Sequence, residues 1–338
     1  MDIKKVLKTL SDTKGVSGNE NHICKTALEF LKPYCPDAMI KNSNVIGTFG
    51  DFIQGRPHIL LDAHIDQVGM IVTYITDEGF IKVGNVGGLD RRLLPAQQVE
   101  IHGKKNIKGV VCSIPPHLAS SQEVLKMEQV TIDTGYSKDQ LEEIVSVGDF
   151  VSFCGEFQPL LGDCVTGLAL DDRCGTASIL YALELLKDKK DSINYNVTVL
   201  FSSQEELGEK GAKISAFEIN PDIAIAVDVS FGYAYGDDIK KCGKLGEGTM
   251  IGISPSLSAE ISENLINTAK NKNIPYQLEV MNGLTSTNAD RFAVNRCGAK
   301  ACTLSIPLRY MHTPVEVINM KDVEYTGLLI SEYLKGAE

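Results

Sequence analysis

Short apolar strands that alternate with amphipathic helices constrain the fold of this chain more than any other feature. After Val165 we predict strands at residues 196–201, 223–227, 249–253 and 301–306, and helices at 176–186, 257–272 and 323–334. Before residue 64 we predict helices at 3–10 and 20–31 and strands at 38–46 and 58–63. Such alternation is typical of an α/β sheet covered by helices. The run Ile59-Leu-Leu61 suits a strand that is buried on both faces.

The segment between these two parts has a different sequence pattern. Residues 68–163 contain short alternating strands separated by Gly and Pro, with one helix predicted at 137–144. We therefore predict a small β-domain at 68–163, inserted into an α/β domain formed by residues 1–67 and 164–338. A chain of 338 residues is long enough for both.

Composition and charge exclude several classes of protein. The 43% hydrophobic and 23% charged content is near the average for folded soluble proteins, and no apolar run approaches the roughly 20 residues of a spanning helix. The net charge of −11 repels phosphate backbones and anionic lipid, so we expect neither nucleic acid nor a membrane as partner. The first ten residues lack a signal-peptide core, and the nine cysteines lack paired spacing, so we expect a cytoplasmic protein with reduced thiols.

Two adjacent carboxylates, Asp171 and Asp172, stand where a loop becomes an apolar helix. An ordinary explanation is that they cap the helix and complement its dipole, which stabilises a helix by about 1 kcal/mol. Cys174 lies beside them and is either a metal ligand or, more often for a cysteine in such a run, a packed core residue. The pair alone does not decide between these readings.

Four other polar positions also follow or end a predicted strand: His64 with Asp66, Glu205 with Glu206, Asp228, and His312. Each has an ordinary explanation by itself, as a satisfied core histidine, an acidic helix start or a turn residue. Ligands of α/β sheets bind beyond the carboxyl ends of the strands, so these positions are expected to converge there. Imidazoles and several carboxylates are what a pair of divalent metals needs, and the histidines favour zinc or cobalt over magnesium.

Nine short motifs in order along the chain resemble those of a known family, the dinuclear-metal aminopeptidases that include the tetrahedral (TET-type) and glutamyl aminopeptidases, some of which have been labelled endoglucanases. The motifs are Gly15-Val-Ser-Gly18, Ala63-His-Ile-Asp-Gln-Val-Gly69, Gly87-Gly-Leu-Asp90, Pro115-Pro-His-Leu118, Ile132-Asp-Thr-Gly135, Leu170-Asp-Asp-Arg173, Gln204-Glu-Glu206, Val227-Asp-Val229 and Pro307-Leu-Arg-Tyr-Met-His312. The resemblance covers nearly the whole chain. It implies a zinc-exopeptidase-like α/β domain with a mixed sheet and helices on both faces, plus an inserted domain that is similar to a small β-barrel.

The resemblance also implies two divalent cations per subunit, zinc or cobalt, and a set of ligands for them. Asp171 would bridge the cations, His64 and Asp228 would complete one site, and Glu206 and His312 would complete the other. The peptide bond after Asp171 would be cis, as it is in related exopeptidases.

The implied activity is removal of N-terminal residues from peptides that have a free N-terminus. Glu205 would be the general base, and Asp66 would support His64 from behind. The resemblance further implies that the β-domain mediates dimerisation and that dimers gather into a larger homo-oligomer, often a dodecamer.

Three alternatives remain at this point. A carboxypeptidase or an amide deacylase of the same clan would use similar ligands, and a glycoside hydrolase would also need paired carboxylates. The glycosidase is disfavoured because the chain has no Trp and only 7% aromatic residues. A non-catalytic assembly protein would require the loss of a ligand or of the base. The preferred N-terminal residue is open, because Asn288 stands where the family usually has Asp and the nearby acid is Asp290.

Overall fold

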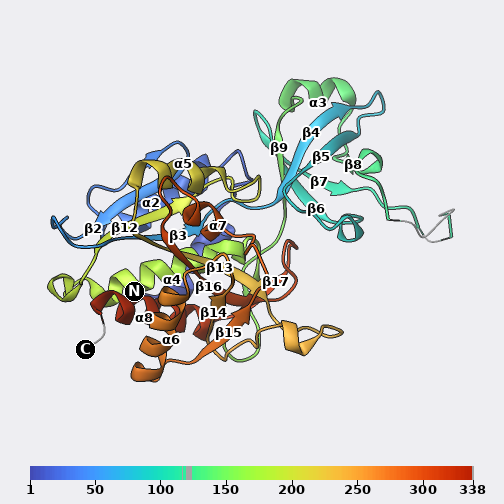
Figure 1. The fold of residues 1–338 in the computed structure, drawn as a ribbon. Coiled ribbons are helices and arrows are strands. Elements are labelled where there is room, and N and C mark those ends of the chain that lie inside the picture. Colours follow the sequence, from blue (N-terminus) through green and yellow to red (C-terminus); the bar gives the residue numbers. More distant parts are fainter. Residues whose placement is uncertain (116, 119–123, 337–338) are drawn as a thin grey trace.

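A computed structural model describes residues 1–115, 117–118 and 124–336 of the chain (Figure 1). It has two parts, a large mixed sheet flanked by helices and a closed β-barrel joined to it. Pro116, within one of the nine motifs, lies outside the described residues. Within the described ranges, no helix is both long enough and apolar enough to cross a membrane.

The large sheet is parallel at its centre, an antiparallel pair flanks the centre on each side, and the edge strand β15 is parallel to β14. β12, β3, β13 and β16 are parallel neighbours, whereas β2 pairs antiparallel with β12 and β14 pairs antiparallel with β16. The order across the sheet is β1 (Met39–Lys41), β2 (Asn44–Phe49), β12 (Asn196–Ser202), β3 (His58–His64), β13 (Ile223–Phe231), β16 (Lys300–Leu308), β14 (Thr249–Ile253) and β15 (Tyr276–Val280). The predicted mixed α/β architecture is confirmed.

Helices cover both faces because successive residues of the central strands point to opposite sides. In β3, Ile59 and Leu61 face one core, whereas Leu60 faces the other. The first core includes side chains of α1 (Ile3–Asp12), α2 (Asn21–Leu31), α4 (Leu170–Leu186), α6 (Ala259–Lys272) and α8 (Met320–Lys335). The second includes side chains of α5 (Lys210–Ile219) and α7 (Ala289–Ala293). The run of apolar residues in β3 is therefore explained by burial on both faces of the sheet, as predicted.

Several elements differ from the prediction. The single strand predicted at 38–46 is a hairpin, because Asn42 and Ser43 have positive φ and turn the chain between β1 and β2. α5, α7 and β15 were not predicted. The first core-facing residues of α5 are small, Gly211 and Ala212, so its apolar periodicity is weak. Four short 3₁₀ helices complete the described helices: η1 (Arg91–Leu93), η2 (Met127–Gln129), η3 (Lys190–Ser192) and η4 (Ile239–Lys241).

The barrel has its own apolar core and lies within the predicted insertion. Its strands close in the order β4 (Gly69–Ile75), β5 (Ile81–Val86), β8 (Thr131–Asp133), β7 (Asn106–Val111), β6 (Gln98–His102) and β9 (Phe150–Phe153). The predicted helix of this region is α3 (Lys138–Ile144), which adds Leu141 to the core. The barrel-like insertion is thus confirmed, and its role in dimerisation stays a prediction.

A small third sheet fixes the chain where it returns from the barrel. It consists of β10 (Gln158–Pro159), β11 (Cys164–Gly167) and β17 (Glu316–Asn319). The antiparallel register sets Gly167 opposite Glu316. This sheet therefore places the start of α4 beside the first residue of β17, an arrangement that matters for the site below.

Candidate metal centre

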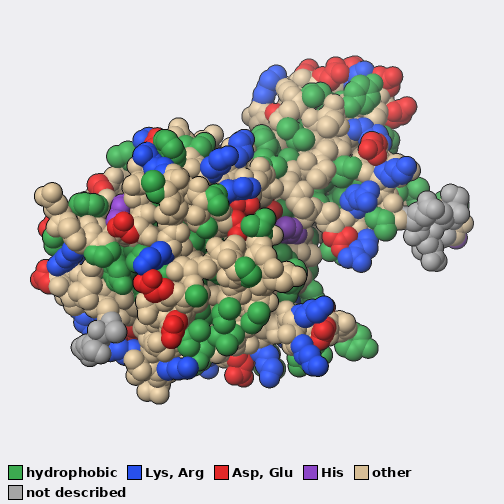
Figure 2. Space-filling model, viewed as in Figure 1, with side chains coloured by type: hydrophobic (Ala, Val, Ile, Leu, Met, Phe, Trp, Pro, Cys, Tyr) green, Lys and Arg blue, Asp and Glu red, His purple; other side chains and the backbone are tan. Residues whose placement is uncertain are grey.

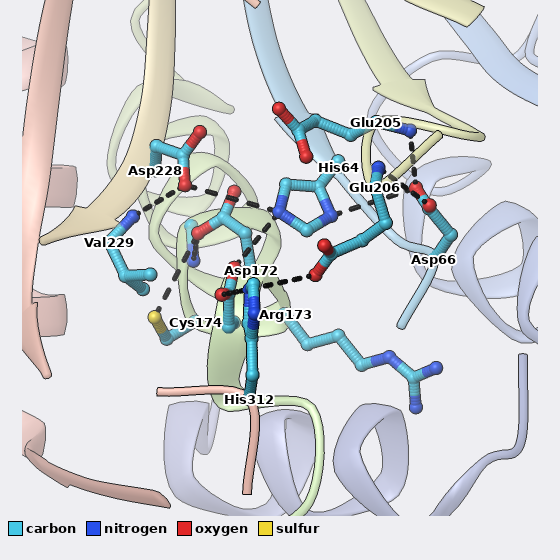
Figure 3. A network of polar contacts seen from close by, with 12 residues as sticks. His64, Asp66, Asp172, Arg173, Cys174, Glu205, Glu206, Asp228, Val229 and His312 are labelled. Carbon is cyan, nitrogen blue, oxygen red and sulfur yellow. Dashed lines mark hydrogen bonds and ion pairs between the residues drawn. The ribbon is translucent and has the colours of Figure 1, made fainter. Parts of the chain in front are cut away.

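Polar side chains from distant parts of the chain meet at the carboxyl ends of the central strands (Figure 3). His64 is the last residue of β3 and pairs in register with Ser202, the last residue of β12. Asp228 lies in the neighbouring strand β13, and His312 follows the end of β16. Parallel strands bring their carboxyl ends to one edge of a sheet, so the convergence expected from the sequence is observed.

Asp171 occupies the centre of this cluster. It lies at the start of α4 with non-helical backbone angles, and its peptide bond to Asp172 is cis, as expected. Its Oδ1 lies 3.0 Å from Nε2 of His64, whereas its Oδ2 lies 3.3 Å from Nε2 of His312. The two oxygens of one carboxylate therefore face two different imidazoles.

The first set of potential ligands, which we call the inner group, comprises His64, Asp171 and Asp228. All three are buried, and Nε2 of His64 lies 3.9 Å from Oδ1 of Asp228. The same Asp228 oxygen accepts a hydrogen bond of 2.7 Å from the Val229 backbone N–H. Two members of the inner group are thus carried by neighbouring strands of the sheet.

The second set, the outer group, comprises Asp171, Glu206 and His312. Nε2 of His312 lies 3.2 Å from Oε1 of Glu206, and the His312 side chain is 28% exposed. Nδ1 of His312 lies 2.7 Å from the carbonyl oxygen of Gly88, to which it donates a proton when Nε2 is free to bind a metal. A Cβ at Gly88 would lie 3.1 Å from that nitrogen, so the barrel segment approaches the ring closely because residue 88 is glycine.

Asp66 holds the turn that presents the two glutamates. Its carboxylate accepts hydrogen bonds from the backbone N–H groups of Glu205 at 3.0 Å and Glu206 at 3.2 Å. Nδ1 of His64 lies 3.6 Å from Oδ1 of Asp66, slightly beyond hydrogen-bond length. Asp66 therefore lies near the far ring nitrogen of His64 without a hydrogen bond to it, and it orders the Glu205–Glu206 turn.

Glu316 was not identified from the sequence. Its buried carboxylate accepts hydrogen bonds from the backbone N–H groups of Asp171 at 3.2 Å and His312 at 2.9 Å. It thereby ties together two residues that are 141 positions apart, since 312 minus 171 is 141. The available signal was an acid that opens the apolar strand β17, four residues after His312.

The charges of the cluster favour a cation. Burial raises the pKa of Glu205 to about 9 and that of Asp228 to about 8, with His64 opposing both shifts. Burial would lower the pKa of His312, but hydrogen bonds with Asp171 and Glu206 raise it to about 11. Four carboxylates thus crowd around two imidazoles, and divalent cations would offset the excess negative charge. Mixed nitrogen and oxygen donors fit the metal centre that the sequence predicts.

The potential ligands line a cavity of ≈ 370 Å³. Glu205 lies in its wall, and its carboxylate stands beside His64 (Figure 3). Acidic side chains and a histidine are visible in the hollow between the two parts of the molecule (Figure 2). A small substrate could therefore reach the cluster from solvent.

Two other residues that the sequence analysis considered, Cys174 and Asn288, do not belong to the potential ligand sets. The Cys174 thiol is buried, lies 3.9 Å from Oδ1 of Asp172, and belongs to none of the ligand groups found among the described residues. The Asn288 amide donates to Oδ2 of Asp62 at 2.7 Å and to the Ser202 hydroxyl at 2.9 Å. Cys174 is therefore a packed thiol, and Asn288 anchors α7 to two strands of the sheet.

Comparison with known proteins places the whole chain among aminopeptidases. Residues 43–329 match the family described as M42 glutamyl aminopeptidase. A lysyl aminopeptidase from Pyrococcus furiosus is 31% identical, with 98% of this chain and 96% of the relative covered. An aminopeptidase structure from Desulfurococcus kamchatkensis superposes with a TM-score of 0.92 at 33% identity, covering 99% of this chain and 95% of that one. The TET1 peptidase of Pyrococcus horikoshii, described as assembling into a tetrahedron or a large octahedral shell, gives 0.87 at 31% identity, with coverage of 99% and 100%.

Proposed function

Because the chain belongs to the M42 glutamyl aminopeptidase family, we propose that it removes N-terminal residues from peptides with two divalent cations held by the inner and outer groups. The observation that carries this proposal is the position of Asp171. One of its oxygens faces His64 and the other faces His312, so a single carboxylate is shared by two adjacent ligand sets. Such sharing would allow two cations to lie side by side, as in two-metal hydrolytic sites.

The proposed ligands are Asp171 as the shared carboxylate, His64 and Asp228 on the inner side, and Glu206 and His312 on the outer side. Cations bound there would polarise the substrate carbonyl and lower the pKa of the attacking water. The mixture of imidazole and carboxylate donors supports zinc or cobalt.

Glu205 is the proposed general base. It lines the cavity, and within the described chain no hydrogen bond to its carboxylate has been identified. A carboxylate at this position, beside His64 and Glu206, is placed to take a proton from a water held among the ligands. The same carboxyl group would then deliver the proton to the leaving amine. Asp66 supports the step by fixing the backbone N–H of Glu205.

A Glu205→Gln variant tests the proposal. We expect kcat on an aminoacyl peptide to fall by roughly 10²–10⁴-fold, since the amide cannot accept the proton. Its metal content, measured by mass spectrometry after saturation and dialysis, should match wild type because Glu205 is not a proposed ligand. Glu218→Gln is a matched control, as Glu218 forms an exposed ion pair with Lys41. Near-normal kcat in Glu205→Gln would remove the assigned role.

A blocked substrate separates the proposed activity from its nearest alternatives. An aminopeptidase should cleave a tripeptide with a free N-terminus and leave its N-acetylated form intact, because cleavage is restricted to the first residue. A carboxypeptidase would cleave both forms at the other end, and an amide deacylase would release acetate. Release of the C-terminal residue first would therefore refute the proposal.

We also propose that the chain forms a homo-oligomer in which the barrel mediates dimerisation. Exposed apolar residues on the barrel, Tyr74 at 54% and Val110 at 45%, and Ile114 at 64% on the adjoining arm, support an interface there. Light scattering would show masses that are multiples of a dimer, and a monomer at micromolar concentration would contradict this. The expected cytoplasmic location stays a prediction.

A further inference from the structure

Outside the proposed metal centre, the described wall of the adjoining cavity lacks positive charge. Besides the proposed ligands and Glu205, it is lined by hydroxyl-bearing residues that include Ser230, Ser286 and Thr287, and by Phe231 and Met311. No lysine or arginine lines this cavity in the described part of the chain. Away from the two histidines of the metal centre, a carboxylate on the substrate would therefore find no cationic side chain in this wall.

The loop at residues 285–290 adjoins this cavity, but neither the amide of Asn288 nor the carboxylate of Asp290 is part of the cavity wall. The Asp290 carboxylate accepts hydrogen bonds from the backbone N–H of Thr285 at 2.9 Å and of Ser286 at 2.9 Å, so it is used in shaping the loop. Asn288 is directed to Asp62 beneath the loop. The acid at position 290 is thus occupied by the backbone and is not free to recognise a substrate side chain.

Glu209 remains as the one carboxylate of the described cavity wall outside the metal centre and its base. Its Oε2 lies 2.8 Å from Nε of Arg291, and the exposed fractions of the two side chains are 14% and 39%. Arg291 lies on the outer side and lines a separate surface groove with Phe217 and Val294. Glu209 therefore lines the cavity of the metal centre, whereas Arg291 lines the separate groove and is absent from the described wall of this cavity.

From this arrangement we infer that Glu209 is a specificity-determining residue, which makes the enzyme prefer a basic or neutral first residue in its substrate and reject an acidic one. The inference rests on the proposed function, because it concerns the side chain that enters this cavity. A cationic side chain is attracted to Glu209, whereas a carboxylate meets like charge and loses its hydration without gaining a partner.

Three tripeptides of matched length test the inference: Lys-Ala-Ala, Gln-Ala-Ala and Glu-Ala-Ala, compared by kcat/KM with metal-loaded protein. We expect the Lys and Gln peptides to be hydrolysed at least about tenfold more efficiently than the Glu peptide, as unpaired charge at a recognition site costs this much or more. The difference between Lys and Gln should shrink as salt is raised, because the pair is partly exposed.

Two variants with opposite expected effects test the contribution of Glu209 to substrate preference. Glu209→Gln should lower the Lys to Gln ratio of kcat/KM, and Arg291→Gln should raise it, since Glu209 then keeps its charge without its partner. Glu260→Gln is the matched control. Glu260 pairs with Lys300 at 2.8 Å, and Lys300 begins the strand β16, whose other end leads to the metal centre. The control should leave the ratio unchanged.

The outcomes separate this inference from the proposed function. If Glu209→Gln and Arg291→Gln change all three substrates by the same factor, Glu209 is only structural and the inference is wrong. If the wild type prefers the Glu peptide, the inference is wrong while the aminopeptidase activity stands. If the folded, metal-loaded protein hydrolyses none of a wider set of tripeptides, the proposed function itself fails.

Discussion

The inner and outer groups of the metal centre are built in different ways. The inner group is buried, and His64 and Asp228 belong to adjacent strands of the central sheet. In the outer group, Glu206 and His312 lie in turns, His312 is 28% exposed, and its ring contacts a carbonyl of the barrel. The sheet register fixes the inner group, whereas the outer group depends on side chains and backbone groups behind it.

This difference teaches where the site is rigid and where it is adjustable. A ligand on a buried strand cannot move without breaking sheet hydrogen bonds, while a ligand in a turn is held by a few contacts. Asp66 and Glu316 supply these contacts. Asp66 accepts a hydrogen bond from the backbone N–H of Glu206, and Glu316 accepts one from the backbone N–H of His312. We therefore expect the outer cation to be lost first when the centre is perturbed.

The largest effect is expected for Asp171→Asn, which damages both groups at once. The amide removes the negative charge that both sites share, so activity should fall by more than the roughly 100-fold that changes behind metal ligands cost. Metal content should drop at both sites in equilibrium dialysis. Retention of one tightly bound cation would show that the inner group holds a metal without Asp171, and the shared carboxylate would lose its importance.

A smaller and unequal effect is expected for Glu316→Gln. The variant weakens the acceptor of the Asp171 and His312 N–H groups, so metal affinity should fall by about 10–100-fold. Titration calorimetry should show the weaker of two binding steps shifting more than the stronger one. Equal shifts in both steps would mean that Glu316 acts mainly through Asp171.

The smallest effect is expected for Gly88→Ala, which touches the outer group alone. The new Cβ would lie 3.1 Å from Nδ1 of His312, so the ring or the barrel segment must move by a few tenths of an ångström. We expect the outer cation to bind about tenfold more weakly or less, at the lower end of changes behind a ligand. Gly84→Ala is the control, because its Cβ would be in ordinary contact at 3.4 Å with Thr73. Equal effects of the two variants would contradict a specific role for Gly88.

The sequence predicted the parts of this molecule that follow local patterns. The buried run in β3 and the strand ahead of Asp228 located the inner group, because a polar residue that interrupts an apolar strand is visible in one segment. The pairing of His64 with Asp171 needed the general rule about strand ends and the resemblance to a family. The barrel could be predicted because the sequence pattern changes there from alternating helices and strands to a series of short strands.

Other parts left no local trace. Glu316 matters because β17 pairs with β11 and brings it beside Asp171, a contact between residues 145 positions apart. The contact of Gly88 with His312 joins the barrel to the sheet across 224 positions. Neither contact leaves a periodic pattern or a fixed spacing in the sequence, because each depends on how separate elements pack. The turn at Asn42–Ser43 was hidden for a different reason, because β1 is only three residues long and β2 follows it after two residues, so the two strands resemble one run.

The most direct test of the account is an anomalous-scattering measurement on crystals of zinc-loaded protein. The shared position of Asp171 predicts two peaks about 3.5–4 Å apart, one among His64, Asp171 and Asp228 and the other among Asp171, Glu206 and His312. A single peak, or two peaks that do not both contact Asp171, would contradict the dinuclear centre on which the proposed function depends.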